Sequence, residues 1–131
     1  MTHLITFSSD AWAVSAETPN PINPIVGQGL LRWLREQLSS AGYDASEPEP
    51  EDWGWYLTAK CGDKSYLVGA SSEIDASSPR EWTVQLHRER SLFERVLGRN
   101  KLQADDPLCL LLEEWIRAHP LTRSLRVHKD P

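Results

Sequence analysis

Residues 53–70 read WGWYLTAKCGDKSYLVGA, and apolar residues alternate with polar ones on both sides of a Gly-Asp pair. This alternation predicts two β-strands, each with one buried face. The Gly62-Asp63 pair suits a two-residue type II′ turn, which would set Cys61 opposite Lys64 and fix the register of the hairpin. The register then pairs Ala59 with Tyr66, Leu57 with Val68, Trp55 with Ala70, and Tyr56 with Gly69.

The two faces of this hairpin differ in chemistry. Trp53, Trp55, Leu57 and Ala59 share one parity, so we expect all four to face the core. Tyr56 lies on the reverse face, where its ring is expected to cover the bare backbone of Gly69.

Further strands are predicted on both sides of the hairpin. Residues 81–87 form a third alternating run, with Trp82, Val84 and Leu86 on its apolar face. Near the N-terminus, residues 4–7 are β-prone and residues 12–14 are a candidate second strand. Three prolines then make residues 18–24 a stiff connector without regular structure. The tail, residues 120–131, either pairs as an edge strand or frays.

Helices are predicted before and after the strands. The first takes Asn23 as N-cap and Pro24 as its first residue, and ends at Gly42. A short helix begins at the capping box Ser91-Leu92-Phe93-Glu94 and stops at Gly98. A third has Asp106 as N-cap and Pro107 as its first residue, and it ends before Pro120.

These elements predict an α+β fold. The strands are grouped in the middle of the chain and joined by short connections, which favours an antiparallel sheet of about four strands. Two or three helices would pack on one face, giving a two-layer sandwich. The 131 residues are expected to form a single domain, residues 1–131, with an irregular lead over residues 1–24.

Composition limits the classes of function. The chain is 40% apolar and 25% charged, as folded domains usually are, and its net charge of −5 argues against a protein that chiefly holds phosphate backbones. No apolar run is long enough to span a membrane, and the N-terminus does not resemble a signal peptide. We therefore expect a cytoplasmic protein that does not bind membranes.

Catalytic and metal-binding motifs are missing from the sequence. The four histidines and two cysteines show no metal-ligand spacing, so no metal site and no cofactor are predicted. Strand parity points Cys61 toward the core and His87 away from it, which disfavours a thiol-imidazole pair. Cys109 and His119 lie about 15 Å apart along one helix. The Gly27-Gln28-Gly29 stretch lacks the third glycine of a dinucleotide-binding loop, although its N–H groups could accept an anion.

The acidic segment at residues 47–52 is the most distinctive charged feature. Its prolines hold the backbone extended and keep the carboxylates apart, which suits a basic protein surface better than a single cation. The alternative interpretation is a solvated linker that shields a sheet edge. The candidate partner-binding residues are Glu47, Glu49, Glu51 and Asp52.

Two other surfaces are candidate binding sites. The polar face of the sheet offers a shallow site made of Tyr56, Lys60, Gln85 and His87, weighed against a plain solvated face. The basic residues that could bind nucleic acid are diluted by glutamates and lack interleaved aromatics, so nucleic acid is disfavoured. They are Arg88, Arg90, Arg95, Arg99 and Lys101.

The run Pro50-Glu51-Asp52-Trp53-Gly54-Trp55 is followed by a hairpin, by Glu81-Trp82, and by Arg90-Ser91-Leu92 leading to residues 98–102. With these features the chain resembles a family of small uncharacterised bacterial proteins over about residues 22–118. The resemblance implies a bacterial origin, and no activity, catalytic residue or binding residue comes with it.

Three functions remain in competition. The absence of catalytic motifs favours a non-catalytic interaction domain, an adaptor or inhibitor-like protein, that uses the acidic segment or the polar sheet face. The alternative is a small enzyme or metabolite-binding protein with a site near Trp12, Tyr56 and His87. The third is a homodimer joined along an exposed strand edge.

Overall fold

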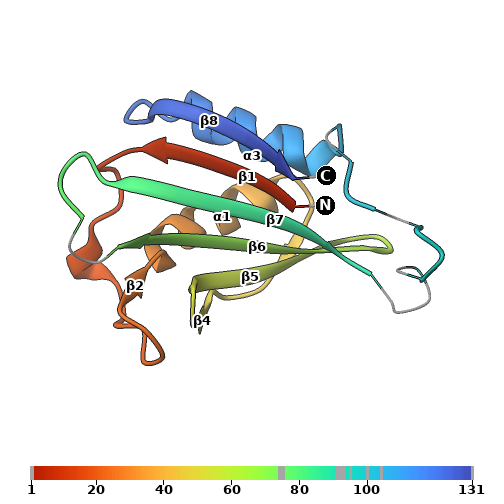
Figure 1. The fold of residues 1–131 in the computed structure, drawn as a ribbon, viewed down its shortest axis with the longest axis horizontal. Helices are drawn as coiled ribbons and strands as arrows, with labels where there is room; N and C mark the ends of the chain where they lie inside the picture. Colours follow the sequence, from red (N-terminus) through yellow and green to blue (C-terminus); the bar gives the residue numbers. More distant parts are fainter. Residues whose placement is uncertain are drawn as a thin grey trace.

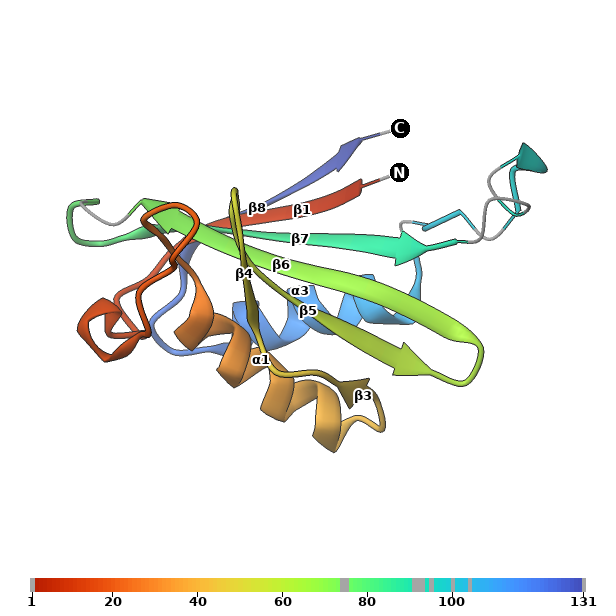
Figure 2. The same cartoon turned by 90° about the horizontal axis from the view of Figure 1, so that it is seen from below.

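The computed structural model describes residues 2–73, 76–90, 94, 96–99, 101–103 and 105–130. Within that part of the chain, the fold is α+β, with one antiparallel sheet of eight strands and two helices packed against it. Figure 1 shows the long strands side by side, and Figure 2 shows both helices on the same side of the sheet. The architecture agrees with the sequence-based expectation, but the sheet has twice the expected number of strands.

The extra strands come largely from short segments at the margins of the sheet. The strands are β1 Thr2–Ser8, β2 Ile25–Val26, β3 Asp44–Ala45, β4 Glu49–Glu51, β5 Gly54–Cys61, β6 Lys64–Glu73, β7 Glu81–Glu89 and β8 Arg123–Asp130. Their main order is β3-β5-β6-β7-β1-β8, while β2 pairs with β6 and β4 pairs with β5. Two-residue and three-residue strands carry too little periodicity to be recognised from sequence.

The central hairpin has the predicted register. Cys61 pairs with Lys64, Leu57 with Val68, and Tyr56 with Gly69. The third predicted strand is β7, which pairs with β6 on the other side. The turn at residues 62–63 therefore sets the alignment of the strands at the centre of the sheet.

The chain ends complete the sheet. Strand β1 lies between β7 and β8 in the interior of the sheet, and the tail pairs with β1 as β8, so residues 123–130 are not frayed. The predicted strand at residues 12–14 is wrong. Residues 12 and 13 are outside the sheet and Val14–Ala16 form a 3₁₀ turn, η1. The proline-rich connector has no regular structure, as expected.

The first helix begins later than predicted. Helix α1 spans Gln28–Ser40, because Ile25 and Val26 pair with β6 as a strand, and neither Asn23 nor Pro24 belongs to the helix. Helix α3 spans Pro107–Ala118 and starts as predicted, with the Asp106 carboxylate accepting a hydrogen bond from the Leu108 N–H at 2.9 Å. Of the predicted helix at residues 91–98, residues 91–93 and 95 lie outside the described residues.

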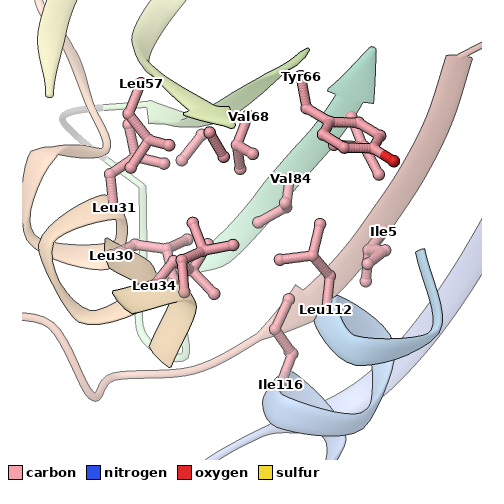
Figure 3. Close-up of a cluster of buried hydrophobic side chains, with 14 of the residues drawn as sticks. Ile5, Leu30, Leu31, Leu34, Leu57, Tyr66, Val68, Val84, Leu112 and Ile116 are labelled. Atoms are coloured by element: carbon pink, nitrogen blue, oxygen red, sulfur yellow. The ribbon is translucent and has the colours of Figure 1, made fainter. Parts of the chain in front are cut away.

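The hydrophobic core lies between the two helices and one face of the sheet. Leucines of α1, together with Leu112 and Ile116 of α3, point toward strand residues such as Leu57 and Val84 (Figure 3). The buried strand residues in this core follow the predicted parity. Two residues that were predicted to face the core, Trp53 and Cys61, do not. Trp53 is only half-buried and Cys61 is exposed, because the first precedes β5 and the second is the last residue of β5, beside the hairpin turn.

Candidate functional site

The candidate site is the face of the sheet that neither α1 nor α3 covers (Figure 2). One row of side chains crosses it through the register, in the order Glu49, Tyr56, Gly69, Gln85, Leu4 and His128. The row runs from an acidic border on β4 to a basic border on β8. Tyr56, Gln85 and Leu4 are half-buried, so the face is a mixed surface of polar and apolar groups.

Trp53 is the largest side chain on this face. A Cβ atom added to Gly69 would lie 2.5 Å from Cη2 of the Trp53 indole, so the ring covers the glycine backbone. The ring centroid of Trp53 is 6.5 Å from that of Tyr56. We predicted that Trp53 would face the core and that Tyr56 would cover Gly69; instead the tryptophan covers the glycine and the tyrosine lies beside it.

The turn between β4 and β5 places Trp53 on this face. Gly54 has a φ of +147°, and a Cβ there would lie 2.6 Å from the carbonyl oxygen of Ala70, so only glycine fits. The Asn20 side-chain amide donates to the carbonyls of Glu51 at 3.1 Å and Gly54 at 2.9 Å. The proline-rich connector thus holds both ends of the turn that carries the indole.

Sequence reasoning missed this position, although the sequence contains a signal for it. Asp52 and Gly54 flank Trp53, and both residue types favour turns over strands. Counting Trp53 as a turn residue would have removed it from the alternating series that starts at Trp55.

Tyr56 is fixed by an acidic neighbour. Its hydroxyl donates to the Glu49 carboxylate at 2.8 Å across the β4–β5 pair. This hydrogen bond, followed by burial, raises the pKa of Tyr56 above its ordinary value. The phenol therefore stays protonated at neutral pH and serves as a hydrogen-bond donor rather than a base.

The other predicted polar residues lie on the same face at different distances. Gln85 and His87 are neighbours on β7, with 3.2 Å between Oε1 and Nε2. Burial lowers the pKa of His87 below its ordinary value, so the imidazole is neutral at neutral pH. Lys60 is exposed and lies four residues from Tyr56, about 13 Å along the strand. The structure therefore brings Tyr56, Gln85 and His87 onto one surface and leaves Lys60 at its margin.

The acidic segment forms part of the sheet edge. Glu47 makes an ion pair with Arg35 of α1 at 2.6 Å, and Glu51 accepts a hydrogen bond from the Asp52 N–H at 2.8 Å. The Asp52 carbonyl accepts from the Asn23 side chain at 2.9 Å. The ion pair therefore draws Glu47 toward α1, away from the uncovered face, whereas Glu49 and Glu51 lie along the border of that face, opposite Tyr56 and Gly54.

Trp12 lies on the opposite side of the sheet. Its ring centroid is 5.7 Å from that of Trp82, 5.4 Å from that of Trp33 and 5.3 Å from that of His119. It therefore joins α1, the sheet and the residue that follows α3 in an aromatic cluster. The structure does not bring Trp12 together with Tyr56 and His87, so the site proposed around these three residues does not form.

The candidate anion site at residues 27–29 is filled by a side chain of the chain itself. The Glu17 carboxylate accepts hydrogen bonds from the N–H groups of Gly27, Gln28 and Gly29, each at 3.0 Å. A carboxylate at a helix N-terminus satisfies exposed N–H groups and interacts favourably with the helix dipole. This end of α1 is therefore a structural contact.

Few features of the described residues point to catalysis. No three of their His, Cys, Asp and Glu side chains are grouped so as to hold a metal ion. Cys109 is buried, and its thiol donates to the Gln103 carbonyl at 3.5 Å.

Two of the basic residues considered for nucleic-acid binding can be followed in the structure as far as it describes them. The Arg88 guanidinium carbon lies 6.0 Å from the centre of the Tyr66 ring, and Arg95 is outside the described residues.

Comparisons of the chain with protein-family models, with curated proteins and with solved structures find no match. No helix among the described residues is long and apolar enough to cross a membrane.

Proposed function

We propose that this chain is a non-catalytic protein-interaction domain, an adaptor or inhibitor-like protein of the bacterial cytoplasm, which binds a basic protein partner through its uncovered sheet face. The main support is the placement of Trp53 and Tyr56 together on that face, beside an acidic border. Tryptophan and tyrosine are enriched among the residues that dominate binding energy at protein interfaces. An aromatic centre with a polar rim is the usual anatomy of such an interface.

The charges at the β4 end of the face, next to the aromatic rings, favour a basic partner. Glu49, Glu51 and Asp52 line the border next to the two aromatic rings, and the whole chain carries a net charge of −5. Complementary charge accelerates association and selects against partners of the wrong sign.

The test is capture from a lysate of the source bacterium, followed by identification of the bound protein and titration with the purified partner. We expect the double variant Glu49→Lys with Glu51→Lys to weaken binding at least tenfold, because it reverses the charge of the border. Gln85→Arg should weaken it similarly, since it places a cation in the middle of the face.

The matched control is Glu36→Lys with Glu114→Lys. It makes the same change in charge at two exposed positions on α1 and α3, the helices behind the sheet. Its affinity should equal that of the unaltered chain. A partner whose affinity falls equally in both double variants, or capture that disappears on nuclease treatment, would overturn the proposal.

A further inference from the structure

A groove of about 540 Å³ opens beside Trp53 on the uncovered face. It lies at the end of β6 and the start of β7, where Ser71 pairs with Thr83. Ser71 is two residues beyond Gly69 on the same face of β6, so the Trp53 indole, which covers Gly69, also forms a wall of the groove. The groove is therefore continuous with the aromatic centre described above.

The groove combines an aromatic wall with negative charge. Its described lining contains two carboxylates, those of Glu73 and Glu81, and no lysine, arginine or histidine. Ser71 and Thr83 add hydroxyl groups that can accept hydrogen bonds, and Ile25 adds an apolar surface.

One cation, Arg80, borders the groove and contacts two of its lining residues. The Arg80 guanidinium donates to the Ser72 hydroxyl at 3.3 Å and to the Glu73 carbonyl. Its Cζ atom also lies 5.9 Å from the centre of the Trp82 ring, which belongs to the core. Arg80 thus lies beside the groove without lining it, and the carboxylates of Glu73 and Glu81 outnumber its single positive charge.

We propose that this groove receives a positively charged side chain, an arginine or a lysine, from the protein partner. The inference rests on the proposed function and names the group that the face recognises. A cation is attracted by the face of an indole and by carboxylates nearby, and a guanidinium also donates hydrogen bonds to hydroxyl groups. A groove of this volume is large enough for a long side chain with its adjoining backbone.

A peptide titration followed by NMR tests the proposal without a known partner. The probe is N-acetyl-Gly-Arg-Gly-amide, and the control peptide carries citrulline, which has nearly the same shape as arginine and no charge. We expect saturable shifts of the Trp53 indole N–H and the Ser71 and Thr83 amides, with affinity at least tenfold higher for the arginine peptide. The indole signal is assigned by its loss in Trp53→Phe.

Charge variants locate the binding site. Glu73→Gln with Glu81→Gln should weaken binding of the arginine peptide at least tenfold, whereas Glu36→Gln with Glu114→Gln, on the helices, should not. Equal binding of the citrulline peptide, or an unmoved Trp53 signal, would overturn the groove proposal. The affinity for the protein partner separates the two proposals. If it falls in Glu49→Lys with Glu51→Lys and not in Glu73→Gln with Glu81→Gln, the groove proposal fails while the proposed function of the face stands.

Discussion

The indole of Trp53 covers the backbone of Gly69 so closely that a methyl group at position 69 would lie 2.5 Å from its Cη2 atom and 2.6 Å from its Cζ3 atom. Gly69 therefore provides the backbone surface against which the Trp53 ring packs. Because the ring comes from a turn and the glycine from the middle of the sheet, the contact depends on both segments being placed correctly.

Substitution of Gly69 by alanine should displace the Trp53 ring. We expect Gly69→Ala to lower the free energy of unfolding by about 1–2 kcal/mol, as overpacking usually does. In a Trp53→Ala background the same substitution should cost less, since the clash with the ring is gone. Urea denaturation of the four proteins in this double-mutant cycle measures the coupling, and strictly additive effects would show that the ring does not lie over position 69.

Removal of the Asn20 side chain should loosen the turn that carries Trp53. Asn20→Ala deletes the donor that bridges the carbonyls of Glu51 and Gly54, and we expect a loss of about 1–2 kcal/mol. The Trp53 indole N–H signal should move toward the position typical of an exposed ring. Asn20→Asp keeps the oxygen that accepts from the Ile22 and Asn23 N–H groups but sets a carboxylate oxygen against the two carbonyls, so it should also lose stability. Stability unchanged in both variants would contradict the role assigned to this amide.

Loss of the Glu17 carboxylate should destabilise the start of α1. Glu17→Ala leaves three N–H groups without their acceptor, and we expect it to cost about 2 kcal/mol. The control is Glu36→Ala, an exposed position on the same helix, which should change stability by less than about 0.5 kcal/mol. Thermal unfolding of both variants at neutral pH distinguishes a capping carboxylate from a surface one.

The buried phenol of Tyr66 should make the fold sensitive to alkali. Its hydroxyl donates to the Asp106 carboxylate at 2.9 Å, and burial together with this hydrogen bond raises the pKa of Tyr66 far above the ordinary value of 10. The unfolded chain ionises Tyr66 near pH 10 while the folded chain does not, so the stabilisation is complete below pH 10 and decreases as the pH rises above it.

The variant Tyr66→Phe removes this linkage. It should be less stable than the unaltered chain by about 1–2 kcal/mol at pH 8, because the hydrogen bond is lost. The difference should shrink between pH 10 and 11, where only the unaltered chain loses stability through this group. Urea denaturation across this pH range checks the prediction, and a constant difference would contradict it.

Local pattern was sufficient for the centre of the fold. The alternation around Gly62-Asp63 predicted the register of β5 and β6, and the Asp106-Pro107 pair predicted the start of α3. Both depend on residues close in sequence, where turn geometry and side-chain parity leave few alternatives. The candidate face could be predicted for the same reason, since Tyr56, Gln85 and His87 follow from strand parity.

Contacts between distant segments decided the rest. Ile25 and Val26 form a strand only because β6 offers them a partner, and the acceptor at the start of α1 is Glu17 rather than the predicted cap at Asn23. The direction of Trp53 depends on the connector residue Asn20 and on the space above Gly69. Sequence alone thus determined the secondary structure that short-range periodicity encodes. The tertiary structure decided where the Trp53 side chain lies, because a turn residue takes its orientation from the segments that pack around it.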